Sequence, residues 1–459
     1  MPNLSETLKK LKEVEPVRLI VSSFFLIIVV GTILLMLPIS SRGGKMTALV
    51  DALFTATSAT CVTGLVVFDT WTHWSTFGHV VILALIQVGG LGFVTLATGF
   101  NLLLRRKLGL RDLLLARESA SGNSMDVSYL IKMILKFTVA CEAVGAVILM
   151  FRFVPQFGAY GIWISVFESV SAYCNAGFDI LGFVEPDASL MNYVDDPLVC
   201  LTISFLIILG GIGFVVVDDV LYSQILPRIK KQKRRRLNFH STTVLISTGF
   251  LLVLGTILYF CCEYDNTMKD MHFLTRLNAS FFQSASARTA GFASIDIAAE
   301  HDFTKIITIV LMFIGASPAS TGGGIKTTTF VVLAAAVCSV MSGRTDAVFR
   351  RRRIEQATVY RALAIFTAAL LVLLITTGVI LSTNSVPISG VDALFEAASA
   401  FGTVGLTAGV TPVLSVPSKL IVSLTMFIGR VGPVSLALAL SLRHRDVGAV
   451  LPEGKLIVG

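Results

Sequence analysis

Long apolar stretches separated by short polar segments run through the whole chain. Eight of them reach the length of about 20 residues that a bilayer-spanning helix requires. Each successive pair encloses a shorter segment that begins with Ala-, Ser- and Phe-rich sequence and ends at a glycine. The pattern predicts an all-α integral membrane protein with eight transmembrane helices and four re-entrant pore loops. The predicted spans are residues 17–37, 80–104, 129–154, 198–225, 243–262, 303–341, 359–381 and 420–442, and the predicted loop helices are 49–60, 163–173, 273–286 and 391–401.

The four short segments align with one another and define an internal repeat. Their final glycines, Gly64, Gly177, Gly291 and Gly405, are 113, 114 and 114 residues apart, and a Phe stands ten residues before each one. A period this regular outranks any single motif as evidence for architecture. We therefore expect four helix–loop–helix units, also written M1–P–M2, with boundaries at residues 1–110, 111–236, 237–353 and 354–459.

A short helix followed by a glycine-ended segment is typical of a pore loop. Glycine adopts backbone angles that other residues resist, and in such loops backbone carbonyls face the ion. Four loops around one axis would form a single central pathway, and the absence of acidic residues from all four segments favours a monovalent cation. The predicted ion-binding residues of this selectivity filter are Val62, Thr63, Gly64, Asn175, Ala176, Gly177, Thr289, Ala290, Gly291, Thr403, Val404 and Gly405.

The second span of the third unit contains a break. Pro318 and three consecutive glycines would interrupt a helix in the middle of the membrane, where irregular backbone survives only if it lines a water-filled cavity or is buried in protein. Arg430 lies inside the last predicted span, and intramembrane charges are functional candidates. We predict a gate beneath the filter, formed by Ala316, Ser317, Pro318, Ala319, Ser320, Thr321, Gly322, Gly323, Gly324, Lys326 and Arg430.

Acidic residues near the pore loops allow more than one interpretation. Asp51, Asp392 and Glu396 stand near the starts of two loop helices, where they can cap the helix and interact with its dipole. Asp69 and Asp179 follow their filter segments, where they either gather cations at the outer mouth or are ordinary surface residues.

Composition and charge support the membrane assignment and set the orientation. Hydrophobic residues make up 54% of the chain and charged residues 14%, against about 25% charged residues in a soluble domain. Of 37 Lys and Arg residues, 25 lie at the termini or in the linkers between units, which predicts cytoplasmic termini and pore loops that enter from outside. The seven cysteines and six histidines show no metal-binding spacing, and no enzyme motif is complete.

The chain resembles the Trk/Ktr/HKT superfamily of potassium transporters. The resemblance rests on the four repeated filter glycines, on the sequence from Gly315 to Thr329 and on the Met426–Arg430 ending, and it covers essentially the whole chain. It is strongest with the bacterial Ktr membrane subunit, the KtrB type. Plant members with serine at the first filter position favour sodium, so Gly64 points to potassium.

The resemblance implies a gated K⁺ uptake pore in the cell membrane, of a family that Na⁺ often stimulates. It also implies a homodimer, contact with membrane lipid, and a cytoplasmic ring of nucleotide-binding RCK-type subunits (KtrA/KtrC type). Any nucleotide would be bound by those partners, and no cofactor is expected in this chain. The alternative is a coupled alternating-access cation symporter (K⁺/Na⁺ or K⁺/H⁺), because broken helices also occur in such carriers.

Overall fold

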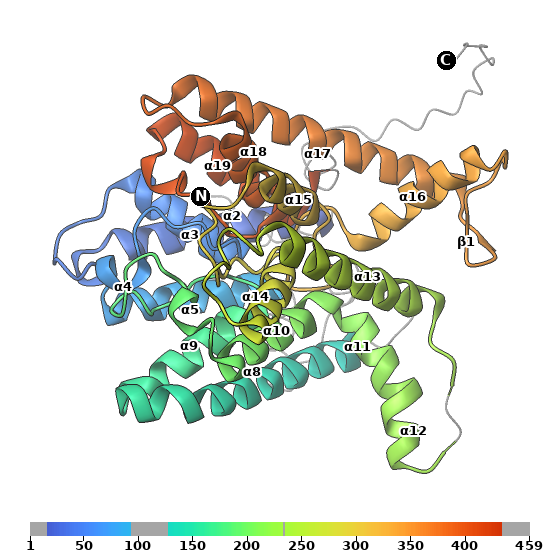
Figure 1. Ribbon diagram of the computed structural model, residues 1–459, viewed down its shortest axis with the longest axis horizontal. Coiled ribbons are helices and arrows are strands. Elements are labelled where there is room, and N and C mark those ends of the chain that lie inside the picture. The colour runs from blue at the N-terminus through green and yellow to red at the C-terminus, as the bar shows by residue number, and fades with distance from the viewer. Residues whose placement is uncertain (1–15, 93–126, 233–234, 434–459) are drawn as a thin grey trace, which may run out of the picture.

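The computed structural model describes residues 16–92, 127–232 and 235–433, and this part of the chain is mostly helical (Figure 1). Predicted features in residues 1–15, 93–126, 233–234 and 434–459, including many of the linker and terminal basic residues, lie outside the described residues. The helices are α2 (Pro16–Met36), α3 (Leu49–Cys61), α4 (Thr70–His73), α5 (Thr76–Leu91), α8 (Val127–Phe157), α9 (Tyr160–Cys174), α10 (Pro197–Ile212), α11 (Phe214–Val220), α12 (Leu226–Ile229), α13 (Phe239–Cys262), α14 (Phe273–Ser286), α15 (Asp302–Phe313), α16 (Thr327–Met341), α17 (Gln356–Thr383), α18 (Gly390–Gly402) and α19 (Val416–Val431).

Short irregular helices and one hairpin complete the secondary structure. Three 3-10 turns cover Pro38–Ser40, Met191–Tyr193 and Thr411–Val413, and a π-helical turn covers Leu221–Ile225. Strands β1 (Val348–Phe349) and β2 (Arg352–Arg353) form an antiparallel hairpin, a small departure from the all-α prediction.

Four short helices lie at the centre and follow one packing rule. Each packs against the long helix before it: α3 against α2, α9 against α8, α14 against α13, and α18 against α17. Each apolar helix that follows packs against the short helix of the next unit: α5 against α9, α10 against α14, α15 against α18, and α19 against α3. The last pair closes the chain's end onto its beginning, so the packing is cyclic.

Residues of the short helices form much of the core. Phe54, Phe167 and Phe395, which stand ten residues before their glycines, are fully buried. In the third unit Phe281 is half-buried and Phe282 takes the buried position instead. The structure thus shifts the third short helix by one residue relative to the sequence alignment.

Within the described residues, three helices are long and apolar enough to cross a membrane: α8 from Ile131, α13 and α17. A fourth span is obtained if α10 and the bent helix after it count as one. Helices α2, α5 and α16 are apolar but shorter in their described parts. The predicted spans 80–104 and 420–442 both extend into residues that the structure does not describe.

Two of the predicted spans are interrupted. The chain bends by 98° between α10 and α11 at Gly213, whose φ of +98° is a conformation that favours glycine. The prediction of one continuous helix over 198–225 was therefore wrong. In the third unit α15 ends at Phe313 and α16 begins at Thr327, so the predicted break is present.

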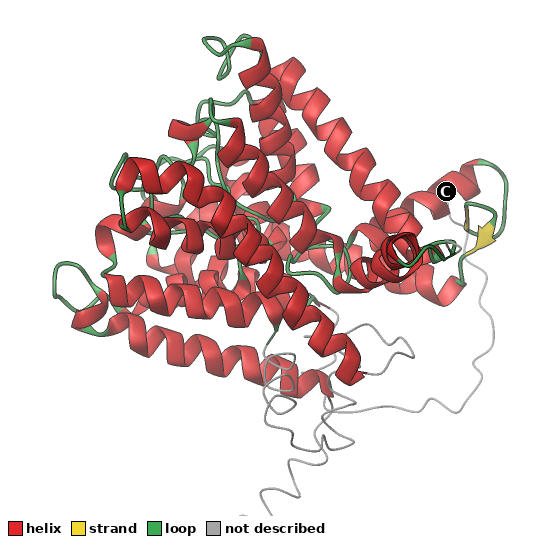
Figure 2. Cartoon of the chain, turned by 90° about the horizontal axis from the view of Figure 1, so that it is seen from below, coloured by secondary structure: helices red, strands yellow, loops and turns green. Residues whose placement is uncertain are grey.

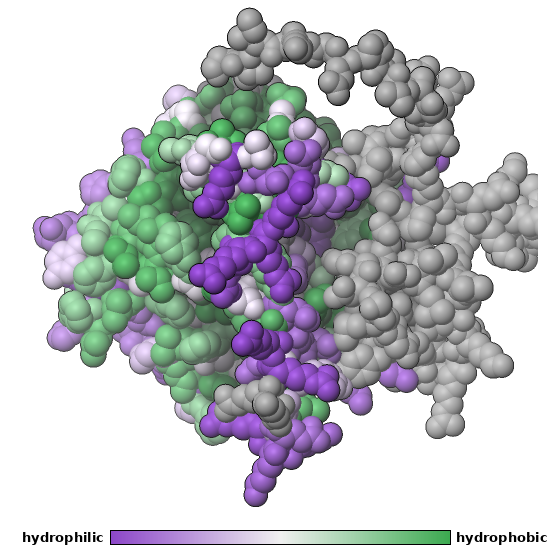
Figure 3. Space-filling model, turned by 90° about the vertical axis from the view of Figure 1, so that its right-hand side faces the viewer, coloured by the Kyte–Doolittle hydropathy of each residue, from purple (hydrophilic) through white to green (hydrophobic). Residues whose placement is uncertain are grey.

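Beyond these breaks, α11, α12 and the β1–β2 hairpin extend away from the helical body (Figure 1), and the view from below shows the strands of the hairpin at its edge (Figure 2). On the face that carries them, hydrophilic residues gather in the middle, beside a hydrophobic area (Figure 3). The exposed basic residues here are Arg228, Lys230, Lys231, Arg235, Arg236, Arg344, Arg350, Arg351, Arg352 and Arg353.

Candidate functional site: a ring of four backbone segments

The segments that follow the four short helices share an unusual backbone conformation. The residue two places before each glycine has a positive φ, and so does the glycine itself. The φ values are +58° at Val62, +60° at Asn175, +79° at Thr289 and +50° at Thr403, and they are +92°, +67°, +84° and +100° at Gly64, Gly177, Gly291 and Gly405. Left-handed backbone is unfavourable for non-glycine residues, so its fourfold repetition marks a conformation that the surrounding structure enforces.

The four segments touch one another in sequence and close a ring. A methyl group on Gly64 would collide with the carbonyl oxygen of Ala176, and one on Gly177 with that of Ala290. Gly291 stands in the same relation to the Val404 oxygen, and Gly405 to the Thr63 oxygen. The structure therefore brings the predicted filter residues of all four units together, with the glycine of each unit against one carbonyl oxygen of the next unit.

Serine side chains hold these segments from behind. The Ser58 hydroxyl accepts a hydrogen bond from the Gly64 amide at 3.1 Å, and Ser399 accepts one from the Gly405 amide at 3.0 Å. Ser171 and Ser286 instead donate to the carbonyl oxygens that follow their glycines. Sequence analysis missed these serines, although three of them stand six residues before the aligned glycine.

The break in the third unit lies against the ring. A methyl group on Gly322 would collide with the Thr289 hydroxyl, and the Gly323 amide donates to the Thr403 hydroxyl at 3.1 Å. The Thr321 hydroxyl donates to the Tyr173 carbonyl oxygen at 3.3 Å. The segment 316–326 thus contacts the ends of three short helices.

The same segment is tied to the kinked second unit and to itself. The Ser317 and Thr321 amides donate to the carbonyl oxygens of Gly211 and Gly210, at 3.1 and 3.3 Å. The Lys326 ammonium donates to the Gly322 carbonyl oxygen at 2.6 Å, which closes the loop on itself. The carbonyl groups of residues 210–211, at the end of α10, thus accept hydrogen bonds from this segment.

Arg430 connects this segment to the first unit. Its guanidinium donates to the Thr321 carbonyl oxygen and to the carbonyl oxygens of Gly89 and Gly90, the last at 3.2 Å. Gly89 and Gly90 belong to the last turn of α5, where carbonyl groups lack intrahelical partners and carry partial negative charge. The structure therefore places Arg430 beside the predicted gate segment, with backbone oxygens as its partners.

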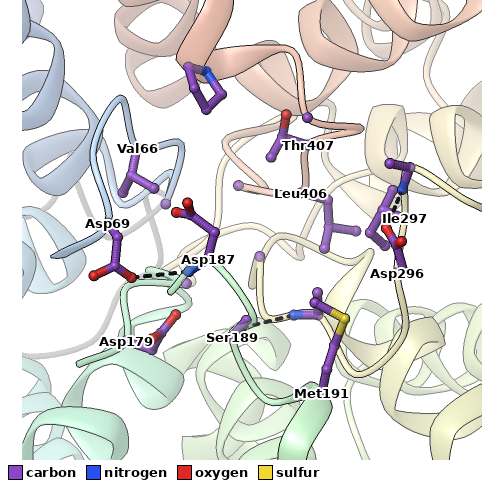
Figure 4. Close-up of a pocket in the computed structure, with 18 of the residues that line it drawn as sticks. Val66, Asp69, Asp179, Asp187, Ser189, Met191, Asp296, Ile297, Leu406 and Thr407 are labelled. Carbon is purple, nitrogen blue, oxygen red and sulfur yellow. Dashed lines mark hydrogen bonds between the residues drawn. The ribbon is translucent and has the colours of Figure 1, made fainter. Parts of the chain in front are cut away.

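On its other side the ring forms the floor of a cavity of about 280 Å³, lined by all four ring glycines. Asp69, Asp179, Asp187 and Asp296 line its walls (Figure 4). The Asp187 amide donates to the Asp69 carboxylate at 3.3 Å. Burial and the nearby Asp69 charge raise the pKa of Asp179 to about 7. The cavity therefore concentrates negative charge next to the four glycines.

Two ion pairs clamp the short helices from outside the ring. Lys305 at the start of α15 binds Asp392 in the first turn of α18 at 2.8 Å, and Lys419 at the start of α19 binds Asp51 in the first turn of α3 at 2.7 Å. The lysines are 114 residues apart, one repeat length. Sequence analysis expected only capping by the aspartates and missed both lysines.

Glu396, also expected near a helix start, has a different role. It is fully buried and accepts hydrogen bonds from the hydroxyls of Thr407, at 2.8 Å, and Thr411. It therefore fastens the segment after Gly405 to α18. Among the described residues no group of three or more His, Cys, Asp or Glu side chains is placed to hold a metal ion.

Apolar helices around a ring of carbonyl oxygens beneath an acidic cavity define an integral membrane protein of the cation-transport class. The sequence profile of the TrkH family, described as "Cation transport protein", matches residues 6–446, and the chain belongs to this family. The resemblance predicted from the sequence is thereby confirmed.

Curated relatives match over nearly their full length. The chain is 39% identical over 448 residues to "Ktr system potassium uptake protein B" of Bacillus subtilis (strain 168), covering 97% of each chain. It is 39% identical over 455 residues to "Potassium/sodium uptake protein NtpJ" of Enterococcus hirae, covering 98% of each. The crystal structure of the potassium transporter TrkH from Vibrio parahaemolyticus shares the fold, with a TM-score of 0.68 and 18% identity over 92% of this chain and 85% of that one.

Proposed function

We propose that this chain is the translocating membrane subunit of a Ktr-type potassium uptake system. The observation that carries the proposal is the closed ring, in which the glycine of each unit lies against one carbonyl oxygen of the next unit. Carbonyl oxygens replace the hydration shell of a monovalent cation. The printed functions of the relatives, potassium uptake and potassium/sodium uptake, agree with K⁺ as the transported ion.

The topology that goes with this function is the one predicted from sequence. Four units with boundaries at 1–110, 111–236, 237–353 and 354–459 would each contribute two spans and one pore loop, with both termini cytoplasmic. The cyclic packing of short helices supports four equivalent units. Exposed basic residues gather on α12 and the β1–β2 hairpin, and the positive-inside rule assigns a face of this kind to the cytoplasmic side.

The segment 316–326 and Arg430 are proposed as the gate. They lie directly against the ring on the side away from the acidic cavity, and the segment has no helical hydrogen-bond ladder of its own. A conducting state requires the segment to move aside, because Gly322 and Gly323 now contact the side chains of Thr289 and Thr403 beneath the ring.

Regulation would come from other polypeptides. The relatives are named as parts of a Ktr system, which implies further components. We expect a homodimer of this chain in the membrane, in contact with lipid, and a cytoplasmic RCK-type ring that binds the regulatory nucleotide. We also expect Na⁺ to stimulate K⁺ uptake.

Transport assays in a strain that lacks potassium uptake test the function. The chain, expressed with a Ktr-type regulatory partner, should restore growth at low external K⁺ and carry K⁺ current in proteoliposomes. A variant that lacks residues 316–324 should show higher basal flux, and flux at or below the parent level would contradict the gate. A fixed stoichiometry of K⁺ with Na⁺ or H⁺ would instead identify the alternative, a coupled symporter.

A further inference from the structure

A buried carboxylate outside the ring and the gate lacks any visible partner. Glu300 lies in the segment between the third ring glycine and α15 and is 5% exposed. Neither of its carboxylate oxygens has a hydrogen-bond partner among the described residues. An ionised carboxylate in such a place is strongly disfavoured unless something neutralises it.

The neighbouring acid, Glu263, is the opposite case. It follows the last residue of α13, is fully buried, and its carboxylate accepts hydrogen bonds from Thr304 Oγ1, the His301 amide, Asn266 Nδ2 and Thr267 Oγ1 at 2.5, 3.1, 2.8 and 2.9 Å. Burial alone would raise the pKa of Glu263, but these donors outweigh burial and hold it below its usual value. Glu263 is therefore the ionised member of the pair.

Backbone contacts hold the two acids together. The His301 amide, next to Glu300, bonds to Glu263, and Asn266 Nδ2 donates to the Ala299 carbonyl oxygen at 2.9 Å on the other side of Glu300. Glu263 and Asn266, which follow α13, thus form hydrogen bonds with the residues on both sides of Glu300. Two neighbouring carboxyl groups in a buried site do not both ionise.

The remaining charged and titratable groups around Glu300 do not neutralise it. Glu263 and Tyr259 face it from α13, Asp296 from its own segment and Lys305 from α15. Lys305 is already bound to Asp392 of α18 at 2.8 Å. Burial first, and then the Glu263 charge, raise the pKa of Glu300 well above the usual value for glutamate.

We propose that Glu300 is a proton-binding site, and that its protonation avoids repulsion from ionised Glu263 and so lets the contacts of Glu263 and Asn266 hold the segment 292–301 against the end of α13. This segment forms one wall of the acidic cavity above the ring, through Ile295, Asp296, Ile297 and Ala298. Loss of the proton places a second negative charge against Glu263 and pushes this wall away from α13. The site makes one side of the outer mouth sensitive to external pH.

The direction of the pH effect follows from the sign of the shift. A carboxyl group with a raised pKa in the folded protein stays neutral there while the unfolded chain ionises above about pH 4.3. Its fastening is therefore intact at low pH and is lost as pH rises through the folded value. Stability therefore falls as pH rises from the unfolded value towards the folded one, and glutamine, a neutral side chain of the same shape, should remove this fall.

Thermal unfolding of the full chain in detergent, from about pH 6 to about pH 9, tests the proposal. We compare the parent with Glu300→Gln and with the control Asp265→Asn, an exposed acid of a neighbouring loop. The Tm of the parent and of the control should fall as pH rises, and the fall should be clearly smaller in Glu300→Gln. Equal slopes in all three proteins would overturn the proposal.

Two further measurements keep the test decisive. Hydrogen exchange, corrected for the intrinsic pH effect, should show segment 292–301 losing protection with rising pH in the parent but not in Glu300→Gln; equal losses in the two proteins would count against the site. Replacing choline chloride by NaCl or KCl at constant ionic strength should leave the alkaline Tm unchanged. A Tm rise with either salt that is absent from Glu300→Gln would show a bound cation instead of a proton and would refute the proposal.

Discussion

Replacement of Lys419 by Met should destabilise the protein far more than a surface substitution. Lys419 and Asp51 join the last apolar helix to the first short helix at 2.7 Å, and their side chains are only 13% and 17% exposed. Removal of one partner from a buried pair leaves the other charge uncompensated, at a cost of about 3–5 kcal/mol. Asp51 lies in the first turn of α3, whose dipole recovers up to about 1 kcal/mol. We therefore expect a loss of about 2–4 kcal/mol in the free energy of unfolding.

Reversible unfolding in mixed detergent micelles measures this loss. Lys45→Met is the matched control, because Lys45 is an exposed lysine of the loop between α2 and α3. The double variant Lys419→Met/Asp51→Asn should lose less stability than Lys419→Met alone, because it removes the orphaned charge along with the pair. If Lys419→Met stays within about 0.5 kcal/mol of the control, or if the double variant is the less stable, the clamp does not hold the ring.

Three other predictions concern the ring, the gate and the outer cavity. Gly405→Ser should lower K⁺/Na⁺ selectivity in flux assays, because its side chain collides with the Thr63 oxygen, whereas Gly44→Ser, also at positive φ but with open space around it, should not. Arg430→Gln should raise basal K⁺ leak through proteoliposomes, and an unchanged leak would contradict its role in closure. Because the pKa of Asp179 is about 7, uptake at low K⁺ should weaken as external pH falls from about 8 to about 6, and Asp179→Asn should reduce this dependence.

The repeated backbone features were predictable from the sequence. The positive φ at the four ring glycines is a conformation that few other residues adopt, so the sequence needs glycine at each of these positions. The four glycines therefore mark the ring in the sequence itself. Pro318 and the glycines after it marked the break between α15 and α16 for the same reason. Conformational requirements of this kind act locally, and a single sequence records them.

Partner choice was not predictable in this way. Lys419 binds Asp51 across nearly the full length of the chain, and no local pattern relates the two. Lys419 is the fourth residue of α19, and the fourth residues of the corresponding helices in the other units differ. Lys305 of α15 forms the same kind of ion pair, whereas α10 and α5 have Cys200 and His79 at this position. A pairing that only half of the repeats retain does not appear in a repeat alignment. The bend at Gly213 was missed for a related reason, because the preceding glycines also fit close helix packing.

The partners of Arg430 indicate how the proposed gate would work. A buried guanidinium that faced a carboxylate would have its charge cancelled by that pair. Here its acceptors are the carbonyl oxygens of Thr321, Gly89 and Gly90, which stabilise the charge without cancelling it. Two of these acceptors belong to α5, a helix end, and only one belongs to the segment 316–326. Movement of that segment would therefore break one hydrogen bond and leave Arg430 held at α5, so the gate would open by displacement of the segment while the arginine stays in place.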